Sequence, residues 1–354
     1  MCGIFGQIGQ EPIPGDHLVR QTRILAHRGP DGAALALFVG LADEPELYAD
    51  RPTRNGLSTW QPLPHGRLPD SRIALGHLRL AIVELSDLGR QPMASADNAL
   101  WIVFNGEIYN HVELRDELVQ LGHRFASHSD TEVILAAYRE WGVDCLKRFN
   151  GMWAFCLIDR SRRKIFFARD RFGVKPLYFW RDGRSLYFAS EIKAFMAVDR
   201  FSFDPSMERM LAYLEDGPSE WEVETMFRGV VKLDAASFIF EDIDTVFDPV
   251  SAQRRWWSLE VDDSKESFDP GISASLANRY FELLKSAVNL RLRADVEVGS
   301  ALSGGLDSSS VVYLSAELLK DVGVRNRQHS FSSVYRTPGA SECDESHYIE
   351  LMAG

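Results

Sequence analysis

The chain has 354 residues, of which 39 are lysine or arginine and 51 are aspartate or glutamate, so its formal net charge at pH 7 is −12. This acidic balance argues against nucleic acid as a partner, because binding a phosphate backbone needs a basic face. The length exceeds one ordinary core and predicts two domains, and the 45% hydrophobic and 25% charged residues are typical of a soluble globular protein.

Neither a membrane span nor a secretory signal is predicted. No apolar run reaches the length that crosses a bilayer, and residues 1–20 lack the apolar core of a signal peptide. The four cysteines have neither the paired spacing of a disulfide framework nor that of a zinc site; they are Cys2, Cys145, Cys156 and Cys343. We therefore expect a cytoplasmic protein with no membrane partner and no metal site of its own.

The first predicted domain covers residues 1–200. A short helix is expected at 16–26, ending at the turn-rich HRGPDG of 27–32, and the Pro, Gly, Asp and Arg of 41–71 predict a long surface excursion. Further strands are predicted at 72–83, 99–110, 151–159, 164–170, 176–180 and 185–190, and helices at 111–122 and 130–142. Strands, then helices, then strands favour an α+β domain of stacked sheets covered by helices.

The remainder of the chain divides into two predicted parts. Patchy periodicity over 201–275 predicts a connecting segment between domains, ordered because Trp, Phe and Leu recur in it. Residues 276–354 then read as a helix, a short strand at 296–302, a glycine turn, a second helix from about 310 and a parallel strand at 329–335. Strand, glycine turn and helix begin an α/β nucleotide-binding fold.

The glycine turn at 303–309 reads SGGLDSS. Glycines let a backbone approach a ligand closely, and serine hydroxyls beside a helix N-terminus form an anion site without a lysine. The Walker A signature is absent. A lone Gly-Gly would more often be a structural turn. The whole motif after a strand, however, resembles the pyrophosphate loop of ATP pyrophosphatases.

That resemblance implies an ATP site whose residues come from the loop and the following strand. Magnesium is expected to bridge the phosphates, since the charge of the leaving group must be neutralised. The residues implied are Leu302, Ser303, Gly304, Gly305, Asp307, Ser308 and Ser333. ATP is thus expected as a substrate with Mg²⁺, and no tightly bound cofactor is expected.

The chain opens MCGIFG, which places a thiol at residue 2. If Met1 is removed, the α-amine of Cys2 becomes the base that activates its own thiol, because base and nucleophile then reside in one residue. A single cysteine at this position is only suggestive.

Seven motifs, the first of which contains this cysteine, give it its context. They are MCGIFG, HRGPDG, GHLRLAIVELS, FNGEIYNH, SDTEVIL, GMWAFCLID and ARDRFGVKPLYF, in this order. The set resembles the class II glutamine amidotransferases, and together with SGGLDSS it is similar to the glutamine-dependent asparagine synthetases. The resemblance covers nearly all of the chain. It implies an αββα N-terminal-nucleophile sandwich of two antiparallel sheets, followed by an incomplete α/β parallel-sheet adenine-nucleotide domain.

The resemblance also implies roles in glutamine hydrolysis. Cys2 attacks the side-chain amide, while Asn105 and Gly106 supply the oxyanion hole that such an attack requires. An Asn-Gly pair is otherwise typical of a hairpin turn, which could itself present these donors. Arg79 is expected on the α-carboxylate of glutamine, and Glu107 and Asp130 on its α-ammonium. The other glutamine contacts implied are Leu80, Ala81, Ile82 and Val83.

Several of these residues have simpler interpretations from the residues alone. Arg79 would more often form a surface ion pair, and Asp130 would cap the helix that follows it. His27, His77 and His111 lack metal-binding spacing, and Cys145 and Cys156 lie in apolar runs typical of a core. Asp170 and Arg171 are interpreted as a structural ion pair at a strand end.

The expected activity is glutamine-dependent asparagine synthesis, with glutamine, ATP and aspartate as partners. Ammonia released at Cys2 would displace AMP from an aspartyl adenylate. The chief alternative is an amide ligase acting on another carboxylate. A phosphoribosyl amidotransferase or sugar-phosphate transaminase would lack SGGLDSS, and a peptide or β-lactam cyclase tends to lose the cysteine.

The C-terminal end departs from the family. Its synthetase domain continues beyond the loop to a second SGEG-type motif, whereas this chain reaches residue 354 without one. We therefore expect a truncated chain with an incomplete second domain, in which glutaminase activity alone, or merely a binding function, is a further alternative. A homodimer is also expected.

Overall fold

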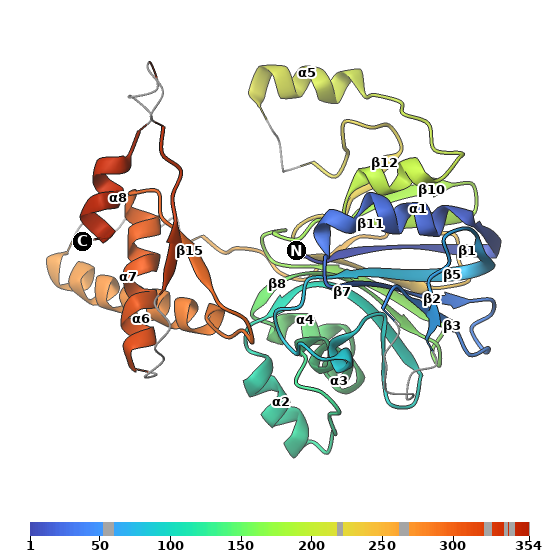
Figure 1. Ribbon diagram of the computed structural model, residues 1–354, viewed down its shortest axis with the longest axis horizontal. Helices are drawn as coiled ribbons and strands as arrows, with labels where there is room; N and C mark the ends of the chain where they lie inside the picture. The colour runs from blue at the N-terminus through green and yellow to red at the C-terminus, as the bar shows by residue number, and fades with distance from the viewer. Residues whose placement is uncertain are drawn as a thin grey trace. The chain divides into compact units, whose positions relative to one another are not determined.

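The computed structural model describes residues 1–51, 60–217, 222–261, 269–321, 328–335, 339 and 344–353. It divides into two compact units, residues 1–260 and residues 261–354, each of which is described by itself below (Figure 1). Among the residues described, no helix is both long enough and apolar enough to cross a membrane.

Two sheets make up the first unit. The larger has the strand order β12-β10-β11-β1-β5-β2-β3-β4, and all of its pairs are antiparallel except β3 with β4. Its strands are β1 (Gly3–Gly15), β2 (Gly32–Phe38), β3 (Glu46–Ala49), β4 (Gln61–Pro62), β5 (Leu68–Arg79), β10 (Tyr178–Asp182), β11 (Ser185–Ala189) and β12 (Val230–Lys232). The first residue of β1 directly follows Cys2.

The second sheet has the order β14-β13-β9-β8-β7-β6 and is antiparallel throughout. Its strands are β6 (Met93–Ala94), β7 (Leu100–Ile108), β8 (Gly151–Asp159), β9 (Lys164–Arg169), β13 (Ser237–Asp242) and β14 (Arg254–Arg255). At its centre β7 pairs with β8 in unbroken register from Leu100–Asp159 to Ile108–Gly151.

The sheets pack face to face with helices outside them, which confirms the expected α+β sandwich (Figure 1). The core between the sheets joins Ile4 and Leu75 of the first sheet to Val103 and Phe167 of the second. Leu18 of α1 packs with the outer side chains of the first sheet, and Leu118 of α2 with those of the second. The helices are α1 (Asp16–Ile24), α2 (His111–Gln120), α3 (Asp130–Trp141), α4 (Cys145–Arg148) and α5 (Met207–Asp216), with 3₁₀ turns η1 (Ala26–Arg28), η2 (Asp87–Gly89), η3 (Gly142–Asp144) and η4 (Ile192–Ala197).

Two segments differ from the sequence-based expectation. In the segment 201–275, expected to connect two domains, residues 201–260 supply β12 to the first sheet and β13 and β14 to the second, and so belong to the first unit. β12 pairs with β10 and β13 pairs with β9, both of which come earlier in the chain, and β14 pairs with β13. The expected excursion at 41–71 supplies β3, β4 and the start of β5; residues 52–59 of it lie outside the described residues.

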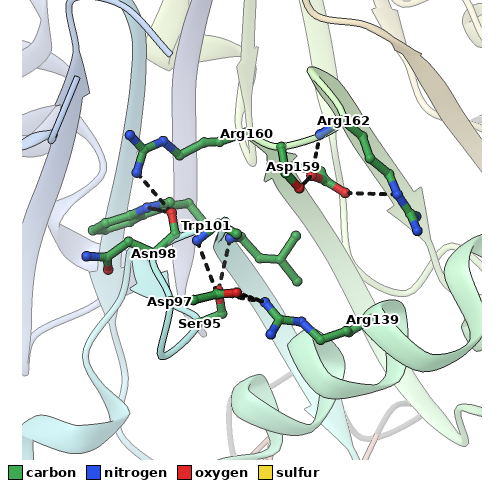
Figure 2. Close-up of polar contacts among 11 residues, drawn as sticks. Ser95, Asp97, Asn98, Trp101, Arg139, Asp159, Arg160 and Arg162 are labelled. Carbon is green, nitrogen blue, oxygen red and sulfur yellow. Dashed lines mark hydrogen bonds and ion pairs between the residues drawn. The ribbon is translucent and has the colours of Figure 1, made fainter. Parts of the chain in front are cut away.

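A polar cluster anchors the beginning of β7, at the end of the strand remote from Asn105 (Figure 2). Asp97 accepts hydrogen bonds from Arg139 of α3 at 2.7 Å and from the Ser95 hydroxyl at 2.6 Å. Arg160 donates to the Asn98 carbonyl at 3.0 Å, as the Trp101 indole does at 3.2 Å. The turn before β7 is thereby bonded to α3 and to the residue that directly follows β8, which stabilises the start of the strand on which Asn105 lies.

The second unit begins the expected α/β arrangement. It contains α6 (Pro270–Arg291), β15 (Gly299–Ala301), α7 (Leu306–Asp321), β16 (His329–Phe331) and α8 (Ser346–Ala353). β15 and β16 pair in parallel, as the sequence predicts. Of its apolar side chains that the structure describes, Val288, Leu302 and Leu314 are buried. The apolar core formed by the described residues of this unit is therefore small.

Candidate active site

A cavity of about 130 Å³ in the first unit collects most of the residues expected to act on glutamine. They reach it from the start of β1, from the end of β5 and the loop after it, from the end of β7 and from the start of α3. Those lining it are Cys2, Arg79, Leu80, Ile82, Val83, Asn105, Gly106, Glu107 and Asp130. Ala81 instead lines the adjacent cavity, where its N–H donates to the Asp31 carboxylate at 2.8 Å.

Cys2 makes two hydrogen bonds with the backbone of Leu80 through its thiol. Its Sγ donates to the Leu80 carbonyl at 3.5 Å and accepts from the Leu80 N–H at 3.4 Å. Its own carbonyl accepts from Arg28, whose guanidinium also donates to Glu191 at 2.7 Å. Although burial raises the pKa of Glu191, hydrogen bonds from Arg28, Lys193 and His27 outweigh it and hold that pKa at about 2. Arg28 therefore links the backbone of Cys2 to the Glu191 carboxylate.

The thiol of Cys2 is not spontaneously ionised. Burial raises its pKa, and the hydrogen bond from the Leu80 backbone opposes this shift only in part. Burial also lowers the pKa of the α-amine of Met1. The N-terminal-nucleophile reaction uses instead the α-amine of Cys2, which becomes free only after Met1 is removed and must be neutral to take the proton of the thiol.

Asn105 and Gly106 lie inside β7, so the hairpin-turn interpretation of this pair is wrong. Asn105 is 1% exposed, and its Nδ2 has no hydrogen-bond partner among the residues that the structure describes. An unpaired buried donor is costly, and where it lines a cavity it is available to a ligand. At Gly106 a side chain would clash with the Met152 carbonyl oxygen, so only glycine permits this approach of β7 to β8.

Gln91, which lies in none of the motifs, and His77, for which no role in the site was predicted, hold this part of β7. The Phe104 N–H donates to Gln91 at 2.6 Å, and Gln91 in turn donates to the Thr131 hydroxyl at 3.2 Å. His77 of β5 donates through Nε2 to the Phe104 carbonyl at 3.2 Å. Burial lowers the pKa of His77 to about 3, so it is neutral and serves as a donor between the two sheets.

Arg79 is half-buried and is not a surface ion-pair residue. Its Nη1 donates to the Ser86 carbonyl at 2.8 Å and its Nη2 to the Glu84 carbonyl. Each of these nitrogens carries a second proton, which leaves donors for a carboxylate. Gly89 lies against this guanidinium, and a Cβ there would clash with Nη2. The loop after β5 therefore orients the arginine toward the cavity.

Asp130 is buried but does not cap α3. Ser129 occupies the cap position, and its hydroxyl accepts from the Thr131 N–H at 3.1 Å. Asp130 instead accepts from the Ile108 N–H at 3.0 Å. Burial raises the pKa of Asp130 to about 6, the Ile108 hydrogen bond and His111 oppose this rise, and nearby Glu107 adds to it. Two carboxyl groups thus share one region of the cavity.

Asp170 is the centre of a turn, not the partner of Arg171. Its carboxylate accepts the backbone N–H groups of Trp153, Phe172, Val174 and Lys175 at 3.0–3.1 Å. Arg171 donates to the Phe149 carbonyl and lies over the Trp256 ring. The turn carries Lys175 into the cavity wall, a residue that the sequence analysis did not select.

In the second unit the SGGLDSS loop follows β15 and precedes α7. Gly304 has φ +85°, which favours glycine. The Ser308 hydroxyl accepts from the Ser303 N–H at 3.2 Å and donates to the Gly305 carbonyl at 3.2 Å. Leu302 is buried, whereas Ser303, Asp307 and Ser333 are exposed. The loop therefore presents hydroxyls and the free N–H groups of a helix start, which fits a polyphosphate.

Comparison with known proteins agrees with this description. Residues 57–257 match the glutamine amidotransferase domain family and residues 279–354 the asparagine synthase family. The structure resembles that of the glutamine phosphoribosylpyrophosphate amidotransferase from Bacillus subtilis, with a TM-score of 0.51 and 18% identity over 96% of this chain and 67% of that one. The fold is thus that of an amidotransferase of the N-terminal-nucleophile type.

The chain belongs to the glutamine amidotransferase family, and its second unit is related to asparagine synthases. It is 32% identical to a putative glutamine-hydrolysing asparagine synthetase of Methanocaldococcus jannaschii, over 99% of this chain and 62% of the relative. It is 35% identical to asparagine synthetase 3 of Bacillus subtilis, over 95% and 48% respectively. The resemblance found in the motifs is confirmed, and the chain spans only 62% and 48% of the length of these two relatives.

Proposed function

We propose that the first unit hydrolyses glutamine and supplies ammonia to an ATP-dependent ligase reaction. One observation carries this proposal: the Cys2 thiol and the unpaired Asn105 Nδ2 line the same cavity as Arg79 and Asp130. A nucleophile, an oxyanion donor and groups for both ends of an amino acid thus occur together.

The chemistry begins after removal of Met1. The α-amine of Cys2 takes the thiol proton, and sulfur bonds to the amide carbon of glutamine. The negative charge moves to the amide oxygen, which Asn105 Nδ2 and the Gly106 N–H receive. The C–N bond then breaks, the nitrogen takes the proton from the amine, and ammonia leaves a thioester. Water hydrolyses the thioester to glutamate and restores the thiol.

Glutamine is oriented by the charges around the cavity. The two remaining protons of the Arg79 guanidinium suit its α-carboxylate, while Glu107 and Asp130 suit its α-ammonium. The backbone of 80–83 completes the pocket. These contacts place the substrate at both ends, so that its side-chain amide meets Cys2 in a single orientation.

In the second unit, ATP is proposed to bind at SGGLDSS. Gly304 and Gly305 would admit the phosphates, Ser303 and Ser308 would donate to them, and Asp307 would hold the Mg²⁺ that accompanies ATP. Leu302 and Ser333 would face the adenosine. Transfer of AMP to a carboxylate, with release of pyrophosphate, makes an acyl adenylate that ammonia can attack. The relatives are glutamine-hydrolysing asparagine synthetases, which favours aspartate as this carboxylate and asparagine as the product. A cytoplasmic location is part of the proposal.

The assay combines the protein with glutamine, ATP, Mg²⁺ and aspartate, and measures glutamate, pyrophosphate and asparagine. We expect all three products, with Met1 absent by mass spectrometry. No glutamate from protein that lacks Met1 would contradict the proposed hydrolysis. Glutamate and pyrophosphate without asparagine would favour the ligase that acts on another carboxylate, and glutamate alone would indicate an isolated glutaminase.

The raised pKa of Asp130 predicts a pH-dependent affinity for glutamine. The carboxyl group is ionised above about pH 6 and attracts the α-ammonium; as the pH falls through 6 it becomes neutral and the attraction is lost. KM for glutamine should therefore rise about tenfold between pH 7 and pH 5, measured by glutamate release. Asp130→Asn should have a high KM that no longer depends on pH over this range. A constant wild-type KM from pH 5 to pH 8 would contradict this role.

A further inference from the structure

Lys175 is a buried cation that the reaction described above does not use. It is 5% exposed and lines the cavity that contains Cys2 and Glu107. Burial lowers the pKa of Lys175, and the nearby Glu107 opposes this shift. Burying an ammonium group is costly, so its position calls for an explanation. Its Nζ donates to the Met1 sulfur at 3.3 Å, and a thioether is a weak acceptor.

The chain holds this lysine in place through several backbone contacts. The Asp170 carboxylate accepts the Lys175 N–H at 3.0 Å, and Arg169 donates to the Lys175 carbonyl at 2.7 Å. Arg169 also donates to the Leu233 carbonyl, which ties the turn to the strand region that follows β12. These hydrogen bonds fix the backbone of Lys175, and its side chain lines the same cavity as Cys2.

We propose that Lys175 is a positioning residue that acts electrostatically through Cys2: its ammonium group stabilises the thiolate and keeps the neighbouring α-amine neutral. This inference rests on the proposed glutaminase function. When Met1 is removed, the sulfur acceptor of Lys175 leaves with it. The ammonium group then faces the exposed α-amine and the thiol of Cys2.

The charges around Cys2 explain why a nearby cation favours its thiolate. The carboxyl groups that hold the ammonium of glutamine disfavour a nearby thiolate, and Asp130 acts on the thiol pKa in this direction. Lys175 has the opposite charge: it lowers the pKa of the Met1 α-amine, and the Cys2 thiolate opposes the lowering of the Lys175 pKa by burial. By reciprocity, ammonium and thiolate favour one another. The charged groups around this pair are Arg28, Asp31, Arg79, Glu107, Asp130 and Asp170.

The test uses Lys175→Met, which removes the charge but keeps an unbranched apolar side chain, and Lys175→Arg, which keeps the charge. The rate of Cys2 alkylation by iodoacetamide is followed against pH by peptide mass spectrometry, together with the pH profile of glutamate release. For Lys175→Met we expect the alkylation profile to move up by about one pH unit, so that the rate at pH 7 falls about tenfold. kcat should fall similarly while KM for glutamine is unchanged or lower, because Glu107 loses a competing cation. Lys175→Arg should restore both.

Lys232→Met is the matched control, because Lys232 is equally buried, at 7% exposed, but lies in β12 and lines a different cavity. It should leave both pH profiles unchanged. The inference is overturned if Lys175→Met has wild-type profiles, or if Lys175→Arg is as impaired as Lys175→Met. Lys175→Gln repeats the test with a neutral polar side chain. Absence of glutamate release by the wild-type protein is a separate result, which would overturn the proposed function instead.

Discussion

Replacing Cys2 with alanine is expected to lower glutamate release by a factor on the order of 10⁴ or more. The proposed reaction passes through a bond between Cys2 Sγ and the amide carbon, and alanine offers no atom to form it. The neutral amine and the oxyanion donors remain, but they have no nucleophile to assist. Synthesis that uses added ammonia in place of glutamine should persist, because it does not require the first unit's chemistry. Both rates are measured by product formation on the same preparation.

The control is Cys156→Ala. Cys156 is fully buried in the core between the sheets, where the smaller side chain should cost about 1 kcal/mol of stability and little activity. Glutamate release that survives in Cys2→Ala would refute the assignment of the nucleophile. Loss of ammonia-dependent synthesis in the same variant would mean that the substitution damages more than hydrolysis.

Asn105→Ala is expected to lower kcat for glutamate release by about 10²- to 10³-fold, with a much smaller change in KM. The amide of Asn105 is proposed to meet the charge that develops on the substrate oxygen, so its loss raises the barrier more than it weakens binding. Because Nδ2 has no partner among the described residues, the substitution removes no hydrogen bond that Nδ2 donates to them. The thermal unfolding midpoint should consequently stay close to that of the wild type.

Asn110→Ala is the matched comparison. This asparagine lies after β7 and is fully bonded: its Nδ2 donates to the Arg148 carbonyl at 3.0 Å and its Oδ1 accepts from the Asn150 N–H at 2.8 Å. We expect Asn110→Ala to lower the free energy of unfolding by about 1–2 kcal/mol and to keep kcat near the wild-type value. Equal kcat losses in the two variants would count against an oxyanion role for Asn105.

Local patterns predicted the strands well where a strand is long and apolar. The run at 151–159 is found as β8 with those bounds, and the parallel pairing of β15 with β16 also follows from the sequence. The strands within 201–260 could not be predicted in the same way. β12 is three residues long, and what makes it a strand is its pairing with β10, far away in the chain.

The candidate site likewise combines residues that the sequence predicts with residues that only the folded structure brings together. A family resemblance leads to Cys2 and Asn105, but their neighbours act through contacts that no local pattern contains. Gln91 reaches Phe104 and Thr131 only in the folded chain, and Lys175 meets the cavity because Asp170 organises a turn. For the Asn-Gly pair, the local pattern predicted a hairpin turn, which is wrong. Nine consecutive pairings of β7 with β8 override this local preference.

The hydrogen bond from His77 to Phe104 joins two separate sheets, and so does the site. Cys2 directly precedes β1 and Arg79 ends β5, both strands of the first sheet, whereas Asn105 and Gly106 lie in β7 of the second. The separation between nucleophile and oxyanion donors is therefore set by the thickness of the apolar layer between the sheets. The volumes of side chains in this layer, such as Ile4 and Val103, therefore help to set the distance between the Cys2 thiol and the oxyanion donors. Substitutions deep in this layer are thus expected to affect turnover as well as stability, although they touch no substrate.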